Sequence, residues 1–196
     1  MKSFRELLLE SPMKMPGDAP FETLKHMSKS ENGIRDEFTY IDTFKDIEIY
    51  QHNSLDWIIA GMFYIDENTS KKLFGIVGEV SYTHRTFKST ANKILRSRDV
   101  ISVDTVHVEE ASRRSGLASI FYKILLRKYN VMSDKLQYEK AALMWKNFAT
   151  ETDNKIYIYD AHEDKIISKM STKTPDSRVW SDDTSKMKIR MIIVPN

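Results

Sequence analysis

Hydrophobic and polar positions follow different periods along this chain, and the changes of period predict where its strands and helices lie. The run from Trp57 to Ile65 is almost entirely apolar, which predicts a strand buried on both faces. After a polar loop, Leu73 to Tyr82 forms the next predicted strand, and Gly75 and Gly78 within it indicate a bulge or a close backbone approach. Two shorter strands are predicted before this hairpin, at Phe38–Ile41 and Ile47–Gln51.

The stretch from Val100 to Ala118 combines a strand, a polar loop and the start of a helix. Near-alternating β-branched residues predict a strand at Val100–Val108, and a helix opens at Gly116 after the loop. The apolar face of this helix is formed by Leu117, Ile120, Phe121, Ile124 and Leu125. The first amides of a helix lack intrahelical partners and carry partial positive charge, so the arrangement favours phosphate binding. Gly116 would let a ligand approach the backbone closely, and Arg113 and Arg114 would add charge.

The rest of the pattern completes a mixed sheet with few helices. Asn130–Met132 is predicted to be a short strand, and apolar residues at helical spacing predict a helix from Tyr138 to Ala149. Near the N-terminus, Asn32-Gly33 predicts a turn. Later strands are predicted at Ile156–Asp160, Lys165–Met170 and Lys188–Val194. The predicted fold class is therefore α/β, with a mostly antiparallel sheet around the central strand, loop and helix.

The composition of the chain excludes several classes of protein. The chain has 196 residues, enough for a single domain with a sizeable core. It has no cysteine, which excludes a disulfide framework and a thiolate metal site. His162-Glu163-Asp164 has no further ligand at metal spacing, so no metal is predicted. No apolar run approaches membrane-spanning length, so we expect a soluble protein with no membrane partner.

A basic segment, Thr83–Arg98, leaves three interpretations open. Its cations are Arg85, Lys88, Lys93, Arg96 and Arg98, and it contains no acidic residue. The first interpretation is a basic loop beside bound phosphates, the second is a nucleic-acid contact, and the third is a solvated loop with a short helix. Nucleic acid is the weakest interpretation, because the net charge is only +2 and the aromatic residues here are too sparse for base stacking.

The segment Arg113-Arg114-Ser115-Gly116-Leu117-Ala118 resembles the R/Q-x-x-G-x-G/A signature of the GNAT (Gcn5-related) acetyltransferases. The preceding Val106-His107-Val108 fits the fourth strand of that family, and the long hairpin before it fits the family order. The segment MSDKLQYEKAALMWKNF resembles phage-encoded members. The plain alternative is an ordinary strand, loop and helix with a basic turn.

The resemblance implies transfer of an acetyl group from acetyl-CoA to an amine, which attacks the thioester directly. It places the acetyl-CoA contacts on Val106, His107, Val108, Arg113, Arg114, Ser115, Gly116, Leu117 and Ala118. The general base is expected on or beside this strand, where the candidates are Asp104, His107, Glu109 and, on the neighbouring strand, Glu79.

The position at which the family carries its general acid departs from the family pattern in this chain. Met144-Trp145 stands where many members have a leucine–tyrosine pair, and an indole is a poor acid. Tyr138, Ser133 or a water is the alternative donor, and Tyr138 and Trp145 are equally well interpreted as core residues.

The first 35 residues are predicted to form an N-terminal extension to a single domain spanning residues 36–196. Met1–Glu10 is amphipathic and resembles the capsid-targeting propeptide of phage internal head proteins, with Leu8-Leu9-Glu10 matching the cleavage context. A docking N-terminal helix is the alternative.

Two hypotheses from different classes follow. The first is a GNAT acetyltransferase acting on an unidentified amine or protein in the host cytoplasm. The second is a non-catalytic GNAT-like phage protein, packaged in the virion, that binds a host or virion protein.

Overall fold

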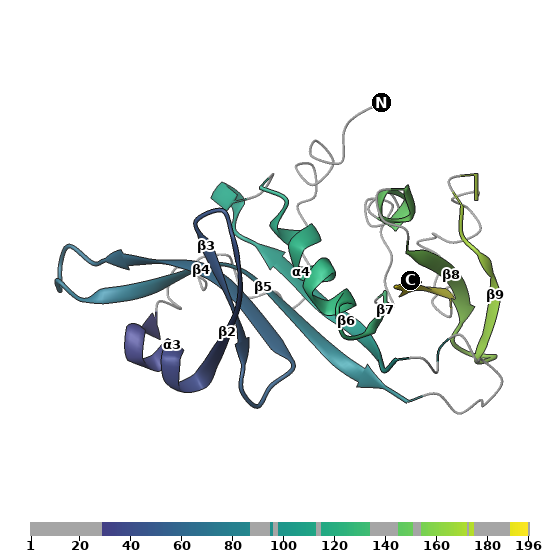
Figure 1. Ribbon diagram of the computed structural model, residues 1–196, viewed down its shortest axis with the longest axis horizontal. Coiled ribbons are helices and arrows are strands. Elements are labelled where there is room, and N and C mark those ends of the chain that lie inside the picture. Colours follow the sequence, from purple (N-terminus) through teal and green to yellow (C-terminus); the bar gives the residue numbers. More distant parts are fainter. Residues whose placement is uncertain are drawn as a thin grey trace. The chain divides into compact units, whose positions relative to one another are not determined.

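The computed structural model describes residues 29–86, 95, 98–112, 115–133, 145–150, 154–171, 173–174 and 189–195 (Figure 1). The N-terminal segment 1–28, and with it the predicted capsid-targeting decapeptide, lies outside the described residues. The chain divides into two compact units. Of the described residues, those within Thr83–Asp104 and Tyr122–Asn196 belong to unit 1, and those from 29 to 82 and within Thr105–Phe121 belong to unit 2.

The described strands form a ten-stranded sheet in the order β2-β3-β4-β5-β6-β7-β10-β8-β9, with β1 pairing with β5 off this path. The strands are β1 (Lys29–Ser30), β2 (Phe38–Phe44), β3 (Ile47–His52), β4 (Trp57–Ile65), β5 (Lys72–Arg85), β6 (Val100–Val108), β7 (Asn130–Met132), β8 (Lys155–Asp160), β9 (Lys165–Lys169) and β10 (Ile189–Val194). Among the pairings whose register is described, only that of β6 with β7 is parallel. The predicted mixed, mostly antiparallel sheet with few helices is thus confirmed.

In unit 2, the antiparallel strands β2 to β5 carry a core against α3 (Glu31–Glu37). Ile34 of α3 is fully buried in a cluster whose other members are Phe38, Tyr50, Ile59, Phe74 and Ile76. The turn predicted at Asn32-Gly33 is wrong, because the Ser30 side chain caps the helix by accepting a hydrogen bond from the Gly33 amide. Residues 29 to 35 therefore pack with the strands that follow them.

The β4–β5 hairpin contains the bulge that its glycines indicate. Ala60 lies opposite Gly78 and Gly61 opposite Ile76, so Val77 is the additional residue on β5. A Cβ added to Gly78 would lie 2.9 Å from Leu117 Cδ2 and 3.1 Å from the His107 carbonyl oxygen. The close backbone approach predicted at Gly78 is confirmed, and it lets the helix start pack directly on β5.

In unit 1, the final strand lies between its neighbours in space rather than at the end of the sheet. β10 pairs with β7 on one side and with β8 on the other, both antiparallel, and β9 continues from β8. A second core cluster joins these strands and consists of Leu95, Val100, Met132, Tyr159, Ile192 and Val194. Residues 145–150 are helical, and Trp145 and Phe148 from this segment pack on Tyr122.

Candidate functional site

The candidate site begins where β6 passes through a short loop into α4 (Leu117–Leu126). A 3-10 turn at Glu110–Ser112 follows β6, and Gly116 then adopts a φ of 91°, a left-handed conformation that favours glycine. The Ile120 amide donates to the Gly116 carbonyl at 3.2 Å, which closes the first turn of the helix. The glycine therefore turns the chain sharply enough for the helix to begin immediately after the loop.

The helix start already has an internal cap. The Leu117 amide donates to Ser115 Oγ at 3.2 Å, and the Ser115 amide donates to the Ser112 carbonyl at 3.4 Å. An anion placed here would replace the serine as the partner of the Leu117 amide. Ser115 and Gly116 are half-buried, so the turn is partly accessible.

The predicted contact residues fall into three groups. Val106, His107 and Val108 are the last three residues of β6, and each is half-buried. The side chains of Leu117 and Ala118 are buried core residues, so only their backbone groups could meet a ligand. Arg113 and Arg114 lie outside the described residues.

Glu79 and Asp104, two of the candidate bases, have different partners. Glu79 is half-buried on β5, and its carboxylate accepts a hydrogen bond from the Trp57 indole Nε1 at 2.9 Å. Asp104 on β6 accepts a hydrogen bond from the Thr83 hydroxyl and lies 3.9 Å from Arg85. Glu79 is therefore oriented by a neutral donor, whereas Asp104 has a cation beside it.

The candidate acids receive less support. Ser133 is 3% exposed, its hydroxyl accepts from the Met191 amide at 3.0 Å, and its own amide donates to the Met191 carbonyl at 2.8 Å. The side chain therefore joins β10 to the end of β7. Trp145 is 2% exposed in contact with Tyr122, so its interpretation as a core residue is confirmed. Tyr138 lies outside the described residues.

The parallel partner of β6 is short. β7 pairs with Val100, Ile101 and Ser102 and ends at Met132, whereas β6 continues to Val108 before the loop to α4. In open α/β sheets, ligands bind beyond the carboxyl ends of parallel strands, where helix N-termini are also found. The turn at Gly116 occupies that position at the end of β6.

An aromatic and polar cluster around Trp57 was not predicted from the sequence. The His52 ring stacks on Trp57 with centroids 6.0 Å apart, and Phe38 packs edge-on against both rings. The alternation along β3 gives a signal for it, because His52 lies two residues after the buried Tyr50 and so shares its face of the sheet. Glu79 joins this cluster through its bond to the Trp57 indole.

Comparison of the chain with protein-family models, with curated proteins and with solved structures finds no match. Within the described part of the chain, no helix has the length and apolar character needed to cross a membrane.

Proposed function

We propose that the protein is an acetyl-CoA-dependent acyltransferase of the GNAT type, which transfers an acetyl group to an amine. The observation that carries the proposal is the left-handed Gly116 at the start of α4, directly after the loop from β6. A backbone turn of this kind exposes amides at the positive end of a helix to a pyrophosphate. The sequence resemblance of residues 113–118 to the GNAT signature selects acetyl-CoA among phosphate-bearing ligands.

The chemistry requires the protein to position both reactants and to support two proton transfers. The amine must lose a proton as it attacks the thioester carbon, and the thiolate of CoA leaves and takes up a proton. Backbone groups of Val106 to Val108 would align the pantetheine arm. Glu79 is the candidate base, because the Trp57 indole orients its carboxylate and introduces no charge.

Calorimetry of the purified protein with acetyl-CoA and with CoA tests this proposal. We expect micromolar binding to wild type and a loss of at least about tenfold in Gly116→Glu, because the new carboxylate would face the pyrophosphate. Gly116→Gln is the matched control, since it has the same side-chain length and the same backbone strain at this φ but no charge. Equal affinities of the Glu and Gln variants would refute binding at this turn.

The residues predicted to act as the general acid suggest a second function. Ser133 and Trp145 are both buried, so the acid role in the first function falls to Tyr138 or to a water. A GNAT-like protein without catalysis, which would bind a host or virion protein, needs no such acid. Absence of acetyl-CoA binding at millimolar concentration, together with this protein in purified virions carrying a processed N-terminus at Ser11, would support the second function over the first.

A further inference from the structure

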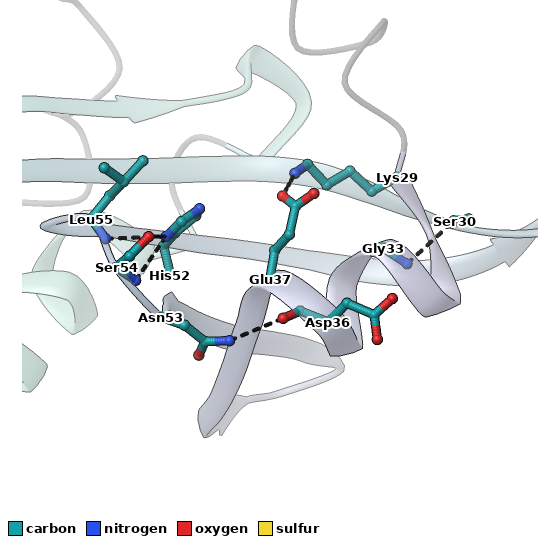
Figure 2. A network of polar contacts seen from close by, with 9 residues as sticks. All are labelled: Lys29, Ser30, Gly33, Asp36, Glu37, His52, Asn53, Ser54 and Leu55. Carbon is teal, nitrogen blue, oxygen red and sulfur yellow. Dashed lines mark hydrogen bonds and ion pairs between the residues drawn. The ribbon is translucent and has the colours of Figure 1, made fainter.

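His52 at the end of β3 holds the turn that leads into β4. Its Nδ1 atom accepts hydrogen bonds from the backbone amides of Ser54 and Leu55, both at 3.1 Å (Figure 2). A ring nitrogen accepts a hydrogen bond only when it carries no proton. These two contacts therefore require neutral His52 with its proton on Nε2.

The turn that His52 stabilises is connected to Trp57 and, through Trp57, to Glu79. The Trp57 amide donates to the Leu55 carbonyl at 2.8 Å, and the Tyr82 amide of β5 donates to the Asp56 carbonyl at 3.0 Å. Trp57 in turn holds Glu79 through its indole. A change in the turn would thus be transmitted to the position of Trp57 and of the carboxylate that it orients.

Two groups near the ring, unlike the two amides, attract a positive charge. Glu37 ends α3, and its pKa is lowered chiefly by the hydrogen bond from Lys29 and, more weakly, by the charge of a protonated His52. The aromatic face of Trp57 also attracts a cation. The charged groups that the described contacts connect to His52 are Glu37 of α3, with Lys29 of β1 bonded to it, Asp56 in the turn itself and, through Trp57, Glu79 of β5.

Two competing arrangements follow from these contacts. Neutral His52 caps the turn, whereas protonated His52 would present an N–H to two other N–H groups and lose both bonds. Its charge would instead be balanced by Glu37 and by the face of Trp57. We propose that His52 makes the β3–β4 turn sensitive to pH: protonation of its ring releases the Ser54 and Leu55 amides and thereby moves Trp57.

NMR of the isotopically labelled protein tests the proposal without any ligand. At neutral pH, the ring nitrogen shifts should report the tautomer protonated on Nε2. As the pH of the sample is lowered from about 8 to 5, the Ser54 and Leu55 amides should shift together with the ring. Their hydrogen-exchange protection factors, which correct for the intrinsic slowing of exchange at lower pH, should fall by about tenfold, which corresponds to the loss of one ordinary hydrogen bond. The Trp57 indole signal should follow the same titration.

His52→Asn is the decisive variant, because its amide oxygen can take the place of Nδ1 and cannot be protonated in this range. We expect it to keep the turn and to abolish the titration of the Ser54 and Leu55 amides. His162→Asn, in an exposed turn of unit 1, is the control that should retain it. A ring protonated on Nδ1 at neutral pH, or amides that ignore the titration of His52, would overturn the proposal. Should His52→Asn fail to fold, the wild-type titration alone decides. None of these readouts depends on acetyl-CoA binding.

Discussion

At the scale of single residues, Gly78 shows how closely the helix start packs on the sheet. Any side chain there would press on Leu117 and on the His107 backbone, which cannot move without disturbing β6. We expect Gly78→Ala to lower the free energy of unfolding by about 1 to 3 kcal/mol, the usual cost of overpacking. Urea denaturation, monitored by circular dichroism, measures this loss of stability.

Gly75 provides the control on the same strand. A Cβ at Gly75 would lie 3.2 Å from the ring of Tyr64, an exposed side chain that can move aside. We therefore expect Gly75→Ala to cost clearly less than Gly78→Ala. If the two variants lost the same stability, the loss would come from the β5 backbone in general and not from packing against α4.

At the scale of elements, the end of α4 depends on a residue that precedes β6. The Arg98 guanidinium donates to the carbonyls of Leu126 and Arg127 at 3.0 and 3.3 Å, which satisfies C-terminal carbonyls and places positive charge at the negative end of the helix. Arg98→Ala should cost about 1 to 2 kcal/mol, measured by the thermal midpoint and by urea denaturation.

Arg35 is the natural comparison for Arg98, because it lies in the last turn of a helix, α3, but makes an ion pair and does not cap the helix carbonyls. Its contact is an exposed ion pair with Glu31 at 2.8 Å, which lowers the pKa of that carboxyl mainly through the hydrogen bond. Exposed pairs contribute little to stability. Arg35→Ala should therefore be milder than Arg98→Ala, and the reverse order would show that capping of α4 is unimportant.

The sequence predicts elements well where the apolar pattern is long. The runs that form β5, β6 and the start of α4 are buried on one or both faces, so their composition follows directly from burial. In β4, residues 58–61 are buried but Met62, Tyr64 and Ile65 are exposed, so the predicted burial of this strand on both faces is wrong for its second half. The prediction from sequence fails at α3. Asn32-Gly33 has turn propensity, but the Ser30 cap and the burial of Ile34 in the core stabilise a helix there. Local propensity yields here to a tertiary contact.

The candidate site was predictable only in part, for a similar reason. A glycine after a strand and before an apolar helix pattern locates the turn at Gly116. The partner of Glu79 was not predictable, because Trp57 reaches it only through the register and bulge of the β4–β5 pairing. Nor does the sequence reveal that Ser133 bonds to Met191, since that contact requires β10 to return beside β7.

At the scale of the whole molecule, we expect the buried Tyr50 in unit 2 and the buried Tyr159 in unit 1 to limit stability at alkaline pH. Burial, and then donation of a hydrogen bond to Glu48, raises the pKa of Tyr50 above its ordinary value of 10.0. Burial and donation to Asp164 raise the pKa of Tyr159 in the same way. Tyr50 lies in unit 2 and Tyr159 in unit 1, so each reports on its own unit.

The sign of the effect follows from proton linkage. The unfolded chain releases these protons near pH 10, whereas the folded protein retains them, so this contribution is complete below about pH 10 and is lost as pH rises further. Between about pH 8 and pH 11, wild type should lose more stability than Tyr50→Phe or Tyr159→Phe, by on the order of 1 kcal/mol or less after solvent screening.

Urea denaturation at the two pH values measures this difference, with the exposed Tyr64→Phe as the control. The phenylalanine variants also lose a hydrogen bond, so they start less stable at pH 8, and the informative quantity is the slope with pH. A shallower slope for only one of the two buried-tyrosine variants would place the alkaline weakness in that unit alone. Equal slopes for wild type and all three variants would show that neither hydroxyl limits the folded state, and the loss would then have to come from other groups that titrate at high pH.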